Sequence, residues 1–262
     1  MALTQISFFS EVLGVSCQVN VILPQQTSLP GAAQDDLPAL WLLHGTGDDH
    51  TIWTRFTSLE HYASAYRLAV VMPAVQISYY TDMHSGGRFF AYIADELPEV
   101  MRGFFRFSTK RADNFAAGLS MGGYGAFKLA FTRPDQYAAC ASLSGVLDLA
   151  AHVARRTQTP DPAFNAHWGR VFSLIFGELD SLRGSPYDLY SMLDAALVQN
   201  VPLPRLYQTC GTEDFLYADN LSFRDHARRL NLDLTYHEAP GDHSWSYWDR
   251  AIQHVLEWLP LG

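Results

Sequence analysis

One serine in the chain stands between small residues in a setting that suits nucleophilic catalysis. Gly118-Leu119-Ser120-Met121-Gly122 has the form G-x-S-x-G, follows a short apolar run and opens a helical pattern. A serine at a sharp strand-to-helix turn projects its Oγ clear of the backbone, and glycines beside it let strand and helix pack closely. The alternative is a flexible Gly/Ser turn before a helix. The context favours Ser120 as a nucleophile.

A serine hydroxyl needs a base that accepts its proton, and the chain contains ten histidines. Where this motif acts in an α/β sheet, the acid follows the serine and the histidine comes last. His243 fits this order, because it lies in a loop between the last strand pattern and the closing helix. His237, at the end of that strand, is the second choice. His226 and His254 lie within helical patterns and are expected to pack or to face solvent.

The acid that orients the base should follow the preceding strand pattern, residues 206–209. Glu213 and Asp214 come after a glycine turn there. Asp214 is preferred, although spacing alone does not separate the two. Asp148, after an earlier strand, is a weaker alternative. Asp242, next to the histidine, is expected to cap its own loop.

Stabilising the oxyanion of an acyl-transfer reaction takes two backbone N–H groups aimed at the developing charge. One should come from Met121, directly after the serine. The other should come from the loop His44-Gly45-Thr46-Gly47, which follows the apolar run 39–43, with Thr46 as the expected donor. Taken alone, this loop could equally be a tight turn at the end of a strand, with no role in catalysis.

A substrate pocket is expected at the carboxyl end of the sheet, where α/β proteins bind their ligands. Tyr79, Tyr80 and Met83 lie in a loop after the strand pattern at 68–72, and Trp168 and Phe172 lie in a later segment that could close over them. Such a pocket, crowded with aromatic rings, would favour small acyl groups. The alternative for each residue is ordinary hydrophobic packing.

The elements that must position these residues alternate between strands and helices along the chain. Alternation of this kind predicts one α/β domain over residues 1–262, with a mostly parallel sheet and helices on both faces. Strands are expected at 17–23, 39–43, 68–72, 114–117, 137–143, 206–209 and 232–236, and helices at 59–66, 88–105, 121–131, 220–230 and 247–259. Pro98 predicts a kink or break in its helix. The alternation fails at about 145–204, which predicts a small cap-like insertion.

Composition excludes several classes of function. Hydrophobic residues make up 48% of the chain, enough for a large core, and the net charge of −9 argues against a nucleic-acid-binding surface. Three cysteines are too few for a disulfide framework and suggest a reducing compartment. The start lacks the features of a signal peptide and no apolar run is long enough to span a bilayer, so we expect a cytoplasmic protein that does not enter a membrane. Metal-ligand spacings and nucleotide-binding glycine motifs are absent from the sequence.

Five stretches together resemble a known family. LLHGTGDD, AGLSMGGYGAFKLA, GSPYDLY, CGTEDFLYADN and GDHSWSYWD are similar to the esterase D branch of the α/β-hydrolases, above all to the short-chain acyl esterases called tributyrin esterases. The resemblance runs from about Ile6 to Leu259. It implies an α/β-hydrolase fold, the triad Ser120, Asp214 and His243, and a carboxylesterase that acts on small-molecule esters with short acyl chains, without a cofactor.

The resemblance implies a homo-oligomer but leaves the substrate open, because related proteins include S-formylglutathione hydrolases, feruloyl and acetylxylan esterases, and mycolyltransferases. The loop reads HGTGDD where relatives often differ after the HG, and this weakens the assignment of Thr46. Three hypotheses follow: a short-chain serine carboxylesterase, a thioesterase or feruloyl-type hydrolase, and a hydrolase fold retained only for binding. The last would require a broken triad.

Overall fold

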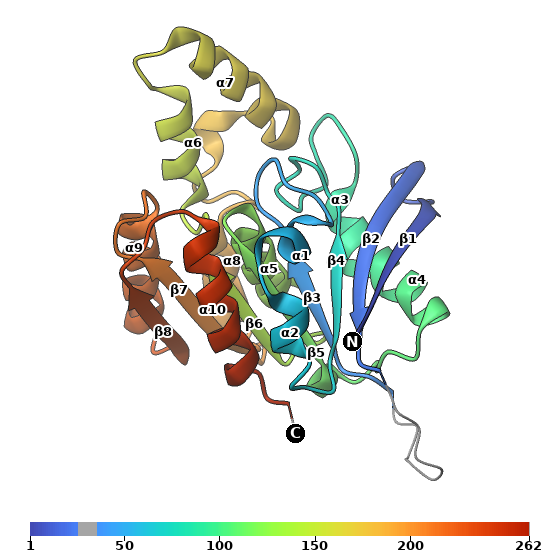
Figure 1. The fold of residues 1–262 in the computed structure, drawn as a ribbon. Helices are drawn as coiled ribbons and strands as arrows, with labels where there is room; N and C mark the ends of the chain where they lie inside the picture. Colours follow the sequence, from blue (N-terminus) through green and yellow to red (C-terminus); the bar gives the residue numbers. More distant parts are fainter. Residues whose placement is uncertain (26–35, 262) are drawn as a thin grey trace, which may run out of the picture.

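The computed structural model describes residues 1–25 and 36–261, and within them the strands form one eight-stranded sheet in the order β1-β2-β4-β3-β5-β6-β7-β8 (Figure 1). β2 runs antiparallel to both of its neighbours, and all other neighbouring strands from β4 to β8 are parallel. The strands are β1 (Ala2–Ser10), β2 (Val15–Leu23), β3 (Ala39–Leu43), β4 (Ala69–Pro73), β5 (Asn114–Leu119), β6 (Ala139–Leu143), β7 (Arg205–Gly211) and β8 (Leu234–Ala239).

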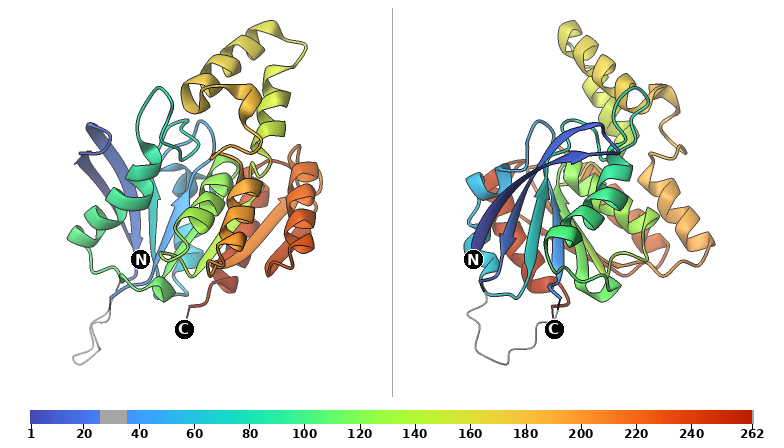
Figure 2. Two further views of the ribbon diagram at one scale, coloured as in Figure 1. Left: turned by 180° about the vertical axis from the view of Figure 1, so that it is seen from behind. Right: turned by 90° about the vertical axis from the view of Figure 1, so that its right-hand side faces the viewer.

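Helices cover both faces of this sheet (Figures 1 and 2). The helices are α1 (Ile52–Phe56), α2 (Leu59–Ala63), α3 (Phe89–Ala91), α4 (Leu97–Phe104), α5 (Met121–Thr132), α6 (Leu149–Thr157), α7 (Pro162–Phe176), α8 (Leu189–Val198), α9 (Tyr217–Arg229) and α10 (Trp245–Trp258). A π-helical turn at Tyr92–Glu96 and short 3₁₀ turns at Arg111–Asp113 and Leu179–Ser181 complete them. The predicted fold class, a mostly parallel α/β sheet with helices on both faces, is confirmed.

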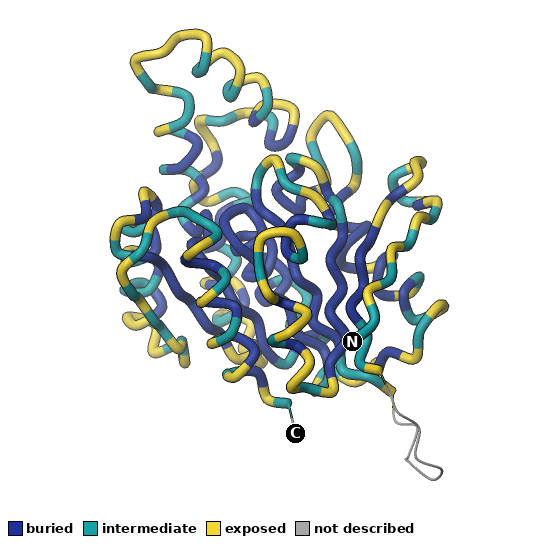
Figure 3. Tube along the Cα trace, in the orientation of Figure 1, coloured by how far each residue is buried: buried dark blue, intermediate teal, exposed yellow. Residues whose placement is uncertain are grey.

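The core has one hydrophobic layer on each face of the sheet. Along β3, Trp41 and Leu43 point into the layer beneath α4, α5, α8 and α9, while Leu40 and Leu42 point into the layer beneath α1, α2 and α10. Successive side chains of a strand alternate between faces, so a strand covered on both sides must be apolar throughout. The central strands are accordingly the most buried part of the chain (Figure 3).

One strand lies outside those predicted, and of the two outcomes predicted at Pro98, a kink or a break, the break does not occur. The strand β1, which is not among the predicted strands, lies at the sheet edge with one exposed face. Its polar and apolar residues alternate, so it lacks the continuous apolar run that is typical of a buried strand. The helical segment around Pro98 does not break: α3, the π-helical turn and α4 follow one another without interruption. Proline lacks the N–H that would bond to the carbonyl four residues earlier, and the wider π turn lies at that point in the helix.

The segment predicted as an insertion, 145–204, divides into two parts. α6 and α7 project beyond the carboxyl ends of the strands, whereas α8 returns to lie along α5 on the face of the sheet (Figures 1 and 2). The loop after β4 is tied to α7, since the N–H groups of His84 and Ser85 donate to the carbonyls of Ile175 and Leu174, each at 2.8 Å. Within the described ranges, no helix combines the length and the apolar character needed to cross a bilayer.

Candidate active site

Ser120 occupies a strained turn between β5 and α5. Its backbone has φ 53° and ψ −117°, a conformation that costs a side-chain-bearing residue about 1–3 kcal/mol. A Cβ at Gly118 would lie 2.4 Å from the backbone of Gly122, and a Cβ at Gly122 would lie 2.4 Å from the carbonyl oxygen of Leu43. Only glycine allows strand and helix to approach this closely. The turn presents the Ser120 hydroxyl at the carboxyl end of the sheet.

Three side chains from distant loops form a continuous chain of hydrogen bonds. The Oγ of Ser120 lies 3.0 Å from Nε2 of His243, and Nδ1 of His243 lies 2.8 Å and 3.0 Å from the two carboxylate oxygens of Asp214. Because Asp214 accepts at Nδ1, that nitrogen carries the proton, and Nε2 is left to accept from the serine hydroxyl. The Asp214 side chain is fully buried, whereas that of His243 is 17% exposed.

The loops that carry the acid and the histidine are joined to each other by Glu213. Its N–H donates to the carbonyl of Gly241 at 3.0 Å, and its carboxylate accepts from the N–H of Gly241 and from the hydroxyl of Thr212. These hydrogen bonds hold the pKa of the Glu213 carboxyl below its usual range. Asp214 instead turns inward, where it also accepts from the N–H of Leu216 at 2.8 Å. The two neighbouring carboxylates therefore do different things.

Two aromatic side chains hold the imidazole of His243 in place. The ring of Trp248, on α10, meets it edge-on at 4.9 Å between centroids, and the ring of Phe215 lies 4.5 Å away. With one nitrogen bonded to Asp214 and two aromatic rings packed beside it, the imidazole has little freedom to turn away from Ser120.

A neutral histidine positions the loop after β3. Val75 donates its N–H to Nε2 of His44 at 3.0 Å, so Nδ1 of His44 carries the proton and donates to the carbonyl of Gly45 at 2.7 Å. Burial lowers the pKa of His44 to about 4 and keeps the ring uncharged. The next residue, Thr46, lines the same cleft as Ser120. Within the described chain, the backbone N–H groups of Thr46 and Met121 have no protein acceptor, so both are available to a ligand.

Ser120 and His243 open onto a cleft of about 430 Å³. The residues that line it are Gly45, Thr46, Asp48, Leu119, Ser120, His152, Arg156, Phe215, His243, Ser244, Trp245 and Trp248. Its apolar wall is built from Phe215 and from Trp245 and Trp248 in the first turns of α10. Its polar wall carries His152 and Arg156, four residues apart on α6 and therefore on one face of that helix.

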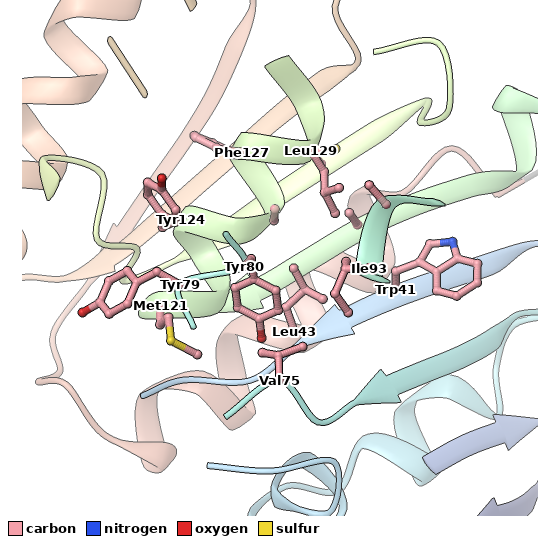
Figure 4. Packing of buried hydrophobic residues seen from close by; sticks show 14 of the residues in the cluster. Trp41, Leu43, Val75, Tyr79, Tyr80, Ile93, Met121, Tyr124, Phe127 and Leu129 are labelled. Carbon is pink, nitrogen blue, oxygen red and sulfur yellow. The ribbon is translucent and has the colours of Figure 1, made fainter. Parts of the chain in front are cut away.

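The five residues predicted for a substrate pocket are not among those that line this cleft. Tyr79, Tyr80 and Phe172 are buried, while Met83 and Trp168 are half-buried. Tyr79 and Tyr80 have φ of 50° and 49°, and this left-handed turn directs both rings into the core, where Figure 4 shows them beside Met121 and Leu43.

The phenol groups of the two tyrosines contact two elements that contribute residues to the cleft, the loop after β3 and helix α6. The hydroxyl of Tyr80 donates to the carbonyl of His44 at 2.9 Å, and that of Tyr79 lies 3.1 Å from Nε2 of His152. Burial lowers the pKa of His152 to about 3, so this ring is neutral as well. Sequence reasoning did not assign His152 and Arg156 to the site. Their i, i+4 spacing indicates that they share one face of a helix, but it does not show that this face is turned toward the cleft.

The other candidate bases and acids have different partners. His226 pairs with Asp194 at 3.0 Å, His237 lies 3.4 Å from the hydroxyl of Thr209, and Asp148 caps the N-terminus of α6. None of these is hydrogen-bonded to Ser120 in the described structure. No group of three metal-ligating side chains occurs among the residues that the structure describes.

A family model covers nearly the whole chain, and several known proteins are similar to it. The model of the Esterase family, described as "Putative esterase", matches residues 10–259. An acetyl esterase of Caldicellulosiruptor saccharolyticus is 27% identical over 99% of this chain and 98% of its own length. Two solved structures from Staphylococcus aureus, the substrate-bound fluorophosphonate-binding serine hydrolase F and an S-formylglutathione hydrolase, are each 36% identical, with TM-scores of 0.88 and 0.85 and 98% of both chains covered in each case.

Proposed function

This chain belongs to the Esterase family and is a carboxylic ester hydrolase, and on that premise we propose that it forms an acyl-enzyme on Ser120, with His243 as the base and Asp214 as the acid. The observation that carries the proposal is the hydrogen-bonded chain from Ser120 Oγ through His243 to Asp214, with 3.0 Å between serine and histidine. The intact chain of three groups also argues against a fold retained only for binding.

The proposed reaction begins when Nε2 of His243 takes the proton of the Ser120 hydroxyl while Oγ attacks the ester carbonyl carbon. Asp214 stabilises the imidazolium that results. The imidazolium then protonates the departing alcohol, which leaves an acyl group on Ser120. Water enters, His243 removes its proton, and attack on the acyl carbon releases the carboxylic acid and restores the serine.

The oxyanion of both tetrahedral intermediates would be held by the N–H groups of Met121 and Thr46. Both are free of protein acceptors in the described chain, and the first belongs to the N-terminus of α5, where the helix dipole favours negative charge. Because N–H groups of the backbone are fixed before the substrate arrives, they stabilise the charge without reorganising. His44 supports this arrangement by holding the loop that carries Thr46.

The nucleophile can be tested directly with a fluorophosphonate, which phosphonylates an activated serine. We expect one adduct per chain, on the peptide that contains Ser120, and no adduct in Ser120→Ala, located by mass spectrometry after digestion. The variant should retain the native circular dichroism spectrum. An adduct on another serine, or activity retained in Ser120→Ala, would contradict the proposal.

For the substrate we propose short-chain acyl esters, as in tributyrin esterases of the esterase D branch. The cleft of about 430 Å³ lies toward the small end of ligand sites, and the acetyl esterase similar to this chain is named for a two-carbon acyl group. With p-nitrophenyl esters, kcat/KM should be highest between acetate and butyrate and should fall toward palmitate. A steady rise from acetate to palmitate would refute a short-chain preference.

A thioesterase is the second candidate, favoured by the S-formylglutathione hydrolase that shares 36% identity with this chain. The acyl-enzyme route is the same, but the leaving group is a thiol. Comparing kcat/KM for S-formylglutathione, p-nitrophenyl butyrate and methyl ferulate separates this candidate from the short-chain esterase and from a feruloyl-type enzyme.

We further propose a cytoplasmic protein that assembles as a homo-oligomer. Support for the compartment comes from Cys17, Cys140 and Cys210, which are all buried free thiols. Support for assembly comes from the esterase D resemblance alone. Cell fractionation and light scattering on the purified protein test the two statements separately.

A further inference from the structure

Two neighbouring arginines on α6 differ in what they contact. Arg155 donates two hydrogen bonds to the carboxylate of Asp219 on α9. Arg156 lines the cleft and lies over two aromatic rings of α7, with its guanidinium carbon 4.7 Å from the ring centre of Trp168 and 5.7 Å from that of Phe164. Among the described residues, Arg156 has no hydrogen-bond partner and no carboxylate beside it. Its charge therefore faces the cleft without an ion pair.

Arg156 supplies the positive charge of its cleft wall. Lysine does not occur among the lining residues, and the neighbouring His152 is neutral because burial lowers its pKa to about 3. The one aspartate or glutamate that lines the cleft, Asp48, belongs to a different element, the loop after β3, where it lies beside Gly45. A negatively charged group would thus be attracted to α6 and repelled by the loop that carries Asp48.

The aromatic contacts prepare Arg156 for an anion. Rings that lie against the face of a guanidinium leave the N–H groups at its edge free, and these form a planar fork that matches a carboxylate. The two ring contacts also restrict the Arg156 side chain before a ligand binds, so less rotational freedom is lost on binding. The molecule as a whole has a net charge of −9, so the unpaired positive charge of Arg156 differs in sign from the charge of the protein around it.

We propose that Arg156 binds a carboxylate on the substrate, so that the enzyme prefers esters or thioesters carrying a negative charge near the scissile bond. The proposal rests on the serine esterase function proposed above and names a substrate class for the same site. The carboxylate can belong to the acyl half, as in a half-ester of a dicarboxylic acid, or to the alcohol or thiol half. In either case the Arg156 side chain positions the substrate and does not take part in the chemistry on Ser120.

Two pairs of substrates test the proposal and distinguish the two halves. In 4-acetoxybenzoate the carboxylate is on the leaving half, and methyl 4-acetoxybenzoate is its neutral partner. In monoethyl glutarate it is on the acyl half, and ethyl valerate is the neutral partner. For each pair the measured quantity is the ratio of kcat/KM, anionic over neutral. Differences in intrinsic reactivity cancel when this ratio is compared between variants.

The variants are Arg156→Gln, Arg156→Lys and Arg170→Gln. Arg170 is exposed on α7 and does not line the cleft, so its replacement changes the net charge equally and is the matched control. A charge-assisted hydrogen bond contributes enough for Arg156→Gln to lower the ratio by about 10-fold to 100-fold in at least one pair. Arg156→Lys should give an intermediate ratio, because it keeps the charge but loses the fork. Arg170→Gln should match the wild type.

A ratio unchanged in Arg156→Gln for both pairs overturns the proposal, as does an equal fall in Arg170→Gln. If Arg156→Gln fails to fold or loses activity on neutral and anionic esters alike, Arg156→Lys decides: a lowered ratio supports the proposal and an unchanged ratio refutes it. Ser120→Ala separates the two levels of inference. If Ser120→Ala keeps its activity, the serine mechanism is wrong. If Ser120→Ala is inactive and the ratio in Arg156→Gln equals that of the wild type, only the assignment of Arg156 is wrong.

Discussion

At the scale of single residues, the pair Glu213 and Asp214 shows how two adjacent carboxylates come to do different work. Asp214 turns inward to Nδ1 of His243, and Glu213 stays at the surface and bonds the loop that carries the histidine. A carboxylate in the Asp214 position selects the His243 tautomer that can accept from serine, whereas one in the Glu213 position only holds backbone.

We therefore expect Asp214→Asn and Glu213→Gln to differ sharply. Asparagine in place of Asp214 would favour the wrong tautomer of His243 and remove the charge that stabilises its imidazolium, with a loss on the order of 10⁴-fold in kcat. Glutamine in place of Glu213 can still accept from Gly241, so its loss should stay within about tenfold. Steady-state kinetics on p-nitrophenyl butyrate measure both. Similar losses in the two variants would show that the assignment of the acid is wrong.

At the scale of elements, the crossing of β3, β5 and α5 sets the geometry of the site. Gly122, in the first turn of α5, packs against the carbonyl oxygens of Leu43 and His44, which lead into the loop that carries Thr46. The serine turn and the loop after β3 are thus in direct backbone contact. Anything that separates them moves the two N–H groups proposed to hold the oxyanion.

Gly122→Ala should therefore reduce both stability and turnover. The new Cβ would lie 2.4 Å from the oxygen of Leu43 and 2.8 Å from that of His44, and these backbone atoms cannot move aside without disturbing β3. We expect a cost of about 3 kcal/mol or more in the free energy of unfolding, measured by urea titration, together with a lower kcat. The matched control is Gly103→Ala on α4, where a Cβ meets nothing within 4 Å. That change should be neutral or stabilising by up to about 1 kcal/mol, and equal losses at both sites would contradict the contact argument.

At the scale of the whole molecule, the sequence holds two lysines in opposite environments. Lys110 is exposed, whereas Lys128, on α5, is buried among the rings of Phe90, Tyr124 and Tyr187 and donates to the hydroxyl of Thr81 at 2.6 Å. Burial lowers the pKa of Lys128 to about 7, from an ordinary value of 10.5. The unfolded chain therefore binds a proton at this lysine between about pH 7 and 10.5 that the folded chain does not bind, and the Lys128 contribution to the free energy of unfolding rises with pH across that window.

Replacing Lys128 by methionine should remove this dependence. Lys128→Met should be more stable than the wild type at pH 7, and the difference should shrink as the pH approaches 10, because an uncharged side chain of similar length no longer has a charge to bury. Urea unfolding at pH 7, 8.5 and 10 measures the difference, and titrations elsewhere in the chain cancel in it. Lys110→Met should show no such trend. A constant difference between Lys128→Met and the wild type would mean that Lys128 keeps its ordinary pKa in the fold.

The sequence by itself determined the fold class and a short list of chemical groups. The apolar run at 39–43 predicts a strand, and β3 has those bounds. The prediction works because a strand that is covered on both faces must be apolar along its whole length. The glycines around Ser120 predict a tight turn, and Ser120 has the positive φ that such a turn requires. These signals are readable because each depends on residues close together in the chain.

Only the tertiary structure decided which of those groups meet. Glu213 and Asp214 are equivalent by spacing, and loop packing alone turns one inward. Tyr79 and Tyr80 point into the core rather than the cleft because of a left-handed turn that no local pattern announces, and Arg156 faces the cleft while Arg155 pairs with Asp219. Such contacts join segments far apart in sequence, and their geometry depends on how strands, helices and loops pack together, which periodicity and composition do not encode.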